Sequence, residues 1–193
     1  MTVKNTTSTW GWPARVLHWV MAVMIIGLVG MGTYISNFET DLVRQFQLIQ
    51  DHKSFGFAVF VLALLRVAWR FANRDTPGLP ADMPSWQVRA SHASHYLLYA
   101  LIFIMPLSGW LMSTASPLND PNAYPVQVKN MVFGLFEMPD PFPTGSKSIS
   151  DVFHVIHSIA GKFLAFILVV HTAAALKHHF VDKDTILKRM TFG

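Results

Sequence analysis

The sequence predicts an all-α integral membrane protein, a single four-helix bundle spanning residues 1–193 with both termini in the cytoplasm. Three observations support this fold class. Of the 193 residues, 52% are hydrophobic and only 13% are charged, which is too apolar for an ordinary soluble domain. The charged residues leave four long gaps, each close to the roughly 20 residues that a helix needs to cross a bilayer. The basic residues gather between these gaps on one side, as membrane topology requires.

The first two predicted spans begin close to the N-terminus. No acidic or basic residue occurs between Arg15 and Glu39, which predicts a helix over residues 15–36. The tail before it is long, polar and aromatic, and no small-residue cleavage site follows, so we expect this span to be retained rather than removed as a signal peptide. The second span is predicted at residues 51–71, where an uncharged run extends into further apolar residues up to Trp69.

The last two predicted spans are bounded in the same way. Between Arg89 and Asp120 there is no charge, which predicts a helix over residues 90–113. A fourth helix is predicted over residues 152–177, where Lys162 is the only charged residue before the inner end. A charge at that depth needs a partner, and the carboxylate of a cofactor is one candidate.

Proline content predicts the connections between the spans. Residues 72–88 contain three prolines and are expected to form a connector on the inner side. Residues 114–150 contain six of the eleven prolines, so this outer segment should be mostly irregular, with a possible short surface helix over residues 126–137. It is equally compatible with a docking loop and with a spacer.

The distribution of charge predicts the orientation. With both termini inside, ten of the fifteen basic residues lie on the inner side and four on the outer side, while acidic residues favour the outer side. The net charge of +4 is therefore explained by membrane topology, and no nucleic-acid partner is expected.

Histidine is the residue type that points to chemistry. The chain has nine histidines and no cysteine, which excludes disulfides, thiolate-bound iron–sulfur clusters and covalently attached haem. Any metal or redox chemistry must therefore use imidazole. An ionisable residue inside a membrane is a functional candidate by default, because its desolvation has to be compensated.

Four histidines pair by depth. His157 and His171 are fourteen residues apart in the fourth span, which places them on one helix face and about 21 Å apart along the axis. At the outer level the matching residue is His52, and at the inner level it is His18. Two bis-imidazole pairs at two depths are what two b-type haems, iron protoporphyrin IX, would require.

Glycines support this interpretation, and other histidines leave alternatives open. Gly56 and Gly161 each follow an outer histidine by four residues and would leave room for a flat macrocycle. His92 and His95 could compete with the inner ligands, or could instead hydrogen-bond a propionate or line a quinone pocket. A lone membrane histidine is more often a packing residue, and solvated roles are expected for His154, His178 and His179.

Several motifs give the chain a specific resemblance over residues 8–181. They are R-V-L-H-W at residues 15–19, D-H-K-S-F-G at 51–56, L-S-G-W at 107–110 and H-x-x-H-S-I-A-G-K at 154–162. With them the chain resembles the bacterial cytochrome b561 family, four-helix dihaem proteins of the inner membrane that include superoxide oxidase. The resemblance implies ligation of one haem by His18 with His171 and of the other by His52 with His157. By this resemblance, the outer segment is longer than in the smallest members of the family.

The resemblance also implies a reaction. It suggests that superoxide in the periplasm gives an electron to the outer haem, and that the electron then passes inward to ubiquinone. Lys53 and Lys162 would place catalytic positive charge near the outer haem, where it could attract a small anion. On the inner side, the candidates for a quinone pocket or a propionate clamp are His178, Arg15, Arg70 and His95.

Two further functions remain as alternatives. The protein could be a haem-bearing membrane anchor that relays electrons between a dehydrogenase or hydrogenase partner and the quinone pool, so that the donor is a redox protein. It could also be a metal transporter, although histidines at two end levels do not suit a single central site.

Overall fold

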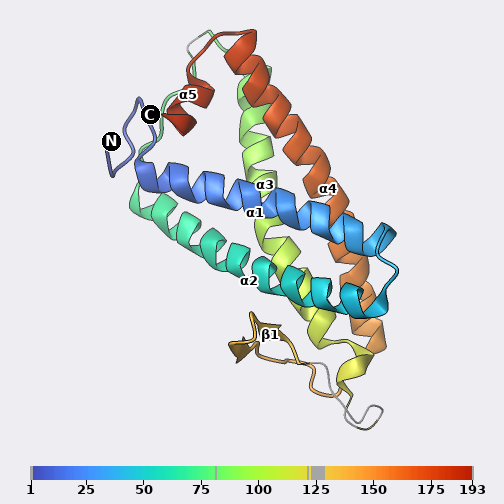
Figure 1. Ribbon diagram of the computed structural model, residues 1–193. Coiled ribbons are helices and arrows are strands. Elements are labelled where there is room, and N and C mark those ends of the chain that lie inside the picture. Colours follow the sequence, from blue (N-terminus) through green and yellow to red (C-terminus); the bar gives the residue numbers. More distant parts are fainter. Residues whose placement is uncertain (1, 81, 121, 123–128, 193) are drawn as a thin grey trace.

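The computed structural model describes residues 2–80, 82–120, 122 and 129–192, and these are mostly helical (Figure 1). Within them, four helices are long and apolar enough to cross a membrane, as the sequence predicts. They are α1 (Trp12–Asn37), α2 (Leu42–Ala72), α3 (Ser85–Thr114) and α4 (Lys147–Phe180). The smaller elements are the 3-10 turn η1 (Pro117–Asn119), the strands β1 (Met131–Val132) and β2 (Phe136–Glu137), and the short helix α5 (Ile186–Thr191).

The helices extend beyond the predicted spans, most of all α2, which begins nine residues earlier than expected. The Asp41 side chain caps its first turn by accepting hydrogen bonds from the backbone N–H groups of Val43 at 2.9 Å and Arg44 at 3.1 Å. The gaps between charges delimit the segment that can lie in hydrocarbon, whereas caps delimit the helix. A helix of 31 residues is about 47 Å long and exceeds a hydrocarbon core of about 30 Å.

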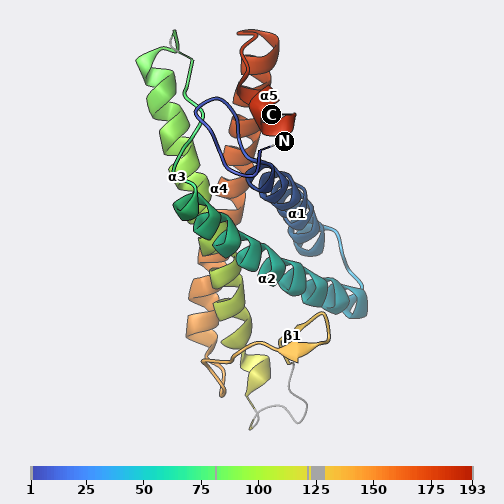
Figure 2. The ribbon, with the colours of Figure 1, turned by 90° about the vertical axis from the view of Figure 1, so that its left-hand side faces the viewer.

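The four helices form two antiparallel pairs that cross obliquely. In Figures 1 and 2, α1 lies beside α2 and α3 lies beside α4, and the first pair runs across the second. Both chain ends lie beside α5, where α1 begins, so the two termini share one end of the bundle (Figure 1). The end at which α1 starts is called the inner end below, and the opposite end the outer end.

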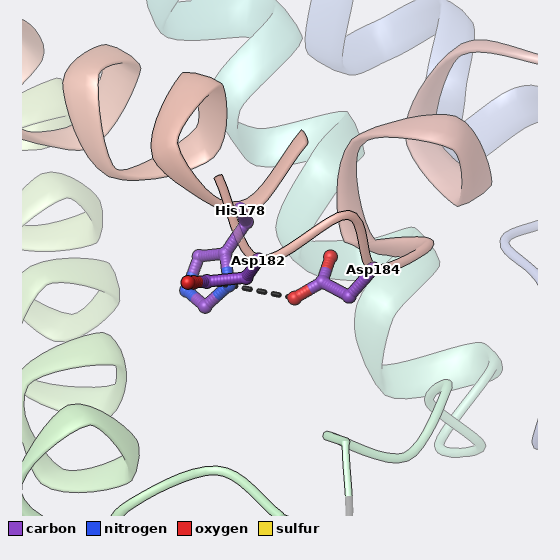
Figure 3. Close-up of side chains that lie close together, drawn as sticks. All are labelled: His178, Asp182 and Asp184. Atoms are coloured by element: carbon purple, nitrogen blue, oxygen red, sulfur yellow. Dashed lines mark hydrogen bonds and ion pairs between the residues drawn. The ribbon is translucent and has the colours of Figure 1, made fainter. Parts of the chain in front are cut away.

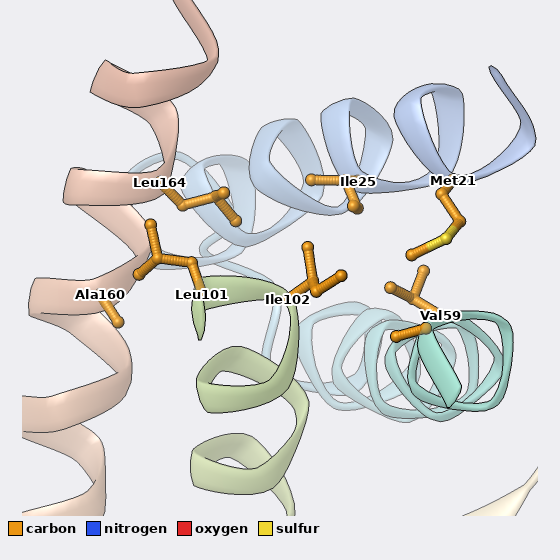
Figure 4. Close-up of a cluster of buried hydrophobic side chains, with 8 residues drawn as sticks. Met21, Ile25, Val59, Leu101, Ile102, Ala160 and Leu164 are labelled. Carbon is orange, nitrogen blue, oxygen red and sulfur yellow. The ribbon is translucent and has the colours of Figure 1, made fainter. Parts of the chain in front are cut away.

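The hydrophobic core lies where the two pairs cross (Figure 4). It contains buried side chains from all four long helices: Met21, Ile25, Val59, Ala63, Leu101, Ile102, Ala160 and Leu164. Along α4 they fall between His157 and His171, and on the other helices they lie between the depths of these two residues. An apolar layer therefore separates the two histidine levels.

The inner end is closed by the two terminal segments. The buried Asn5 side chain donates to the carbonyl of Asp75 at 3.2 Å and accepts from the backbone N–H of Gly11 at 3.0 Å. Gly11 has no room for a side chain, because a Cβ there would overlap the carbonyl oxygen of Val3. On the other side, the Trp19 indole donates to the carbonyl of Met190 at 2.9 Å, which fixes α5 against α1.

The outer segment forms a β-hairpin, and the short surface helix expected there is wrong for the residues that the structure describes. Val132 pairs with Phe136, and the turn between them contains Phe133 and Gly134 with φ of 48° and 70°. Positive φ at both central positions is the geometry of a type I′ turn, which glycine favours. Residues 126–128 of the expected helix lie outside the described residues.

Candidate metal centres

The outer histidine pair lies between α2 and α4. The ring centres of His52 and His157 are 6.3 Å apart, and the ring planes are inclined by 78°. The Nδ1 atom of His157 is 3.0 Å from the carbonyl oxygen of Met105 and 3.1 Å from the Ser108 hydroxyl. Because a carbonyl only accepts, Nδ1 carries the proton and the Nε2 lone pair is left for a metal.

Two glycines allow the outer rings to approach the neighbouring helices. A Cβ at Gly109 in α3 would lie 3.1 Å from Cε1 of His157, and one at Gly32 in α1 would lie 3.3 Å from Cε1 of His52. Both distances are shorter than an ordinary contact of about 3.5–4.0 Å between carbon atoms. Gly56 has no atom within 4 Å of an added Cβ, and Gly161 meets only the end of Met105 at 3.4 Å.

The inner level contains three histidines. The ring centres of His18 and His171 are 6.3 Å apart with an interplanar angle of 72°, close to the values of the outer pair. His95 from α3 lies close to His171, with ring centres 5.7 Å apart. The sequence predicts His18 and His171 as the pair at this level and His95 as a competitor or cofactor neighbour, and the structure places His95 beside His171.

Both pairs fit a metal bound between two imidazoles. A ligating nitrogen lies about 2 Å from its metal and about 1 Å from its own ring centre, so ligands on opposite sides have ring centres about 6 Å apart. Among the described residues, no hydrogen bond occupies a ring nitrogen of His18, His52 or His171, and Nδ1 of His52 is buried without a partner. Such unoccupied nitrogens suit haem iron, which histidine ligates from both faces.

A spacing of fourteen residues relates the two levels in every long helix. It separates His18 from Gly32, His52 from Arg66, His95 from Gly109 and His157 from His171. Fourteen residues return to nearly the same helix face about 21 Å away. The spacing within α4 predicts only His157 and His171, and the same spacing must be applied to α2 and α3 to reveal Arg66 and Gly109.

Lys53 is held by the outer segment. Its ammonium group donates to the Asn130 side chain at 2.9 Å and to the Ser113 hydroxyl at 3.3 Å. Next to it, the buried Ser54 hydroxyl accepts the backbone N–H of Phe133 at 3.0 Å. The hairpin is thereby fixed over α2 immediately beside His52.

Lys162 does not face the outer pair. It is exposed on the bundle surface, and five residues on an α-helix turn it by about 140° from His157. No hydrogen bond or ion pair of Lys162 is present in the described part of the chain.

The basic residues predicted at the inner side bind backbone carbonyls. The buried Arg15 donates to the carbonyl of Thr191 at 3.3 Å, while its Nε has no partner among the described residues. Arg70 donates to the carbonyls of Asn73 at 3.1 Å and Arg74 at 2.9 Å, at the C-terminal end of its own helix. Arg15 thus holds the C-terminal segment, and Arg70 stabilises the end of α2.

His178 belongs to a separate cluster after the end of the fourth span (Figure 3). Its Nδ1 lies 2.6 Å from a carboxylate oxygen of Asp184 and 3.2 Å from one of Asp182. Asp182 also forms an ion pair with Lys177 at 2.6 Å. These contacts account for His178 as the link between α4 and the segment leading to α5.

Comparisons with known proteins identify the family. The profile of the family described as "Prokaryotic cytochrome b561" matches residues 9–193. The chain is 30% identical to "Cytochrome b561 homolog 2" of Escherichia coli (strain K12), with 98% of this chain and 95% of that protein covered. It is 26% identical to "Cytochrome b561 homolog 1" of the same organism, covering 90% and 92% of the two chains.

A third relative is named for a reaction. The chain is 25% identical to "Probable superoxide oxidase CybB" of Yersinia pestis, with 90% of each chain covered. Four helices able to span a membrane, with histidines paired inside them, are what a multi-pass cytochrome needs. The chain belongs to the prokaryotic cytochrome b561 family, bacterial multi-pass membrane proteins that bind haem b and transfer electrons.

Proposed function

We propose that the chain holds two b haems at two depths and moves single electrons across the membrane between them. The observation that carries this proposal is the repetition of one geometry at both levels. The ring centres of His18 and His171 are 6.3 Å apart, and so are those of His52 and His157. Each pair spans the distance expected for two imidazoles that share one metal.

The ligands follow from these pairs. His52 and His157 hold the outer haem, and His18 and His171 hold the inner one. The ring centre of His95 stands 5.7 Å from that of His171, whereas both ligand pairs have ring centres 6.3 Å apart, so we assign His95 as a neighbour rather than a ligand. When bound, haem supplies one-electron chemistry at iron, while the chain fixes its position and surroundings.

The outer level is the side at which we place superoxide oxidation. Two superoxide anions would each lose one electron and leave as dioxygen, and the relative named as a superoxide oxidase supports this donor. Lys53, held by Asn130 and Ser113 beside His52, provides positive charge that attracts a small anion. Lys162 is turned by about 140° from His157 around α4, so it adds only to the overall positive potential of the outer half of the bundle.

The inner level is where we place ubiquinone. An open apolar groove of about 430 Å³ lies between α1 and α2, lined by Leu17, Leu65, Ala68, Trp69 and Ala72. Leu17 directly precedes His18, and the Nε1 of Trp69 is buried without a partner among the described residues. The indole N–H could therefore donate to a quinone carbonyl. Two electrons and two protons would convert one ubiquinone to ubiquinol.

Haem analysis and rapid mixing test this function. The purified protein should contain two haems per chain. Rapid mixing with superoxide should reduce both haems. Addition of ubiquinone should then reoxidise them. One haem per chain would refute the two-level arrangement. Two haems that do not react with superoxide would refute the donor and leave the electron transfer intact.

One observation favours a partner protein as the donor instead. The hairpin presents Leu135, 79% exposed, together with Phe133 and Phe136 at the outer side of the bundle. Such a patch could dock a dehydrogenase or hydrogenase subunit. In that case the isolated protein would not react with superoxide, and its haems would be reduced only when the partner is present.

A further inference from the structure

Arg66 is a charged residue at the inner level that the proposed reaction does not yet use. It lies in α2, fourteen residues beyond His52 and therefore on the same helix face. Its guanidinium carbon is 5.8 Å from the centre of the Tyr99 ring in α3. Tyr99 follows His95 by one helical turn, and the fourteen-residue spacing places Arg66 at the level of the inner histidines.

No protein carboxylate neutralises Arg66. In the described part of the chain, Arg66 forms no ion pair and no hydrogen bond, and it is only partly exposed. The four long helices contain only two acidic residues, Asp51 and Asp151, and both lie at the outer end. Arg15 and Arg70 differ, because each donates to backbone carbonyls.

A guanidinium within a membrane-spanning helix is costly unless an anion accompanies it. Protein carboxylates are absent from this level, whereas each haem b carries two propionate groups. Arginine binds carboxylates through a planar fork of donors, which suits such a group better than lysine does. The missing anion at Arg66 can therefore be part of the cofactor itself.

We propose that Arg66 is a positioning residue for the inner haem, whose propionate it pairs with, and that its charge raises the reduction potential of that haem. This inference rests on the two-haem proposal above. A positive charge nearby favours the reduced haem, which has one positive charge fewer than the oxidised one. With an effective dielectric constant of about 20, a unit charge about 10 Å away changes such an equilibrium by roughly tenfold.

The test is a spectroelectrochemical titration of both haems in the complete protein, purified in a neutral detergent so that lipid phosphate cannot replace the propionate. A His18→Ala variant assigns the midpoints, because it should retain only the outer haem. In Arg66→Gln we expect the equilibrium constant for reduction of the inner haem to fall about tenfold, which lowers its midpoint potential by about 59 mV for one electron. Arg66→Lys keeps the charge, so its inner midpoint should stay close to that of the wild type.

A charge control lies on the same side of the bundle. Arg89 is exposed at the start of α3, and Arg89→Gln should move neither midpoint. If Arg66→Gln keeps both haems and leaves the inner midpoint unchanged, the inference is wrong. If both Arg66→Gln and Arg66→Lys lose the inner haem, Arg66 has a packing role and the inference is wrong as well.

These results are separable from a failure of the proposed function. A wild-type protein with a single haem would refute the two-haem proposal itself. Two haems of which neither responds to Arg66→Gln would refute only the role of Arg66.

Discussion

Substitution of Gly109 by alanine should weaken binding of the outer haem without disturbing the inner one. The added Cβ would lie 3.1 Å from Cε1 and 3.3 Å from Nδ1 of His157. The ring cannot easily turn away, because Nδ1 is bound to the Met105 carbonyl at 3.0 Å and lies beside the Ser108 hydroxyl. The clash can therefore be relieved only if the hydrogen bond from His157 to the Met105 carbonyl lengthens or if His157 moves away from its position as a ligand.

The size of the effect follows from the cost of overpacking. Forcing one extra carbon into a well-packed site typically costs about 1–3 kcal/mol. At about 1.4 kcal/mol for each factor of ten, haem affinity at the outer level should fall about 5- to 150-fold. The assay is haem content per chain by the pyridine haemochrome method during stepwise dilution, with reduced-minus-oxidised spectra to show which haem is lost.

Two other glycines provide matched comparisons. Gly27 is exposed, has nothing within 4 Å of an added Cβ and lies opposite His18 on α1, so Gly27→Ala should retain both haems. Gly32→Ala should have an intermediate effect, because its Cβ would be 3.3 Å from a His52 ring that no hydrogen bond holds. Equal retention of the outer haem in Gly109→Ala and Gly27→Ala would refute the reasoning.

Three further predictions concern the remaining groups. His18→Ala should remove one haem from each chain, whereas His95→Ala should retain both, and haem counting of the two variants checks the assignment; loss of a haem only in His95→Ala would reverse it. Trp69→Phe removes the buried N–H of a residue that lines the inner groove, so the KM for ubiquinone should rise several-fold while haem reduction from outside stays unchanged, as steady-state and rapid-mixing rates would show. Lys53→Gln should slow reduction by superoxide and flatten its dependence on ionic strength, since a fixed charge beside the outer level would be lost; an unchanged salt dependence would show that this lysine does not attract the anion.

The sequence was sufficient to predict the parts of the fold that depend on depth. Gaps between charges delimit what can lie in hydrocarbon, and the spacing of His157 and His171 fixes both a face and a distance on one helix. These quantities need no knowledge of how the helices cross. The four spans are therefore confirmed, and the four histidines form one pair at each of two levels.

What the sequence could not predict depends on contacts between distant segments. Arg15 looks available for a cofactor until α5 folds back and offers it the Thr191 carbonyl. The outer hairpin depends on a turn at Phe133 and Gly134 that docks on Ser54, whereas its apolar residues suit a surface helix equally well. Depth alone likewise cannot show that His95 comes closer to His171 than His18 does.

The apolar layer at the crossing of the helix pairs determines how electron transfer would depend on the membrane voltage. Its buried side chains are all hydrophobic, and the buried polar groups of the described residues lie toward the two ends of the bundle. Electrons can tunnel through such a layer, but protons have no chain of polar groups to follow. Inward transfer would therefore carry uncompensated negative charge against the resting voltage, at about 2.3 kcal/mol per electron for each 100 mV. Turnover would then charge the membrane and slow as the voltage rises.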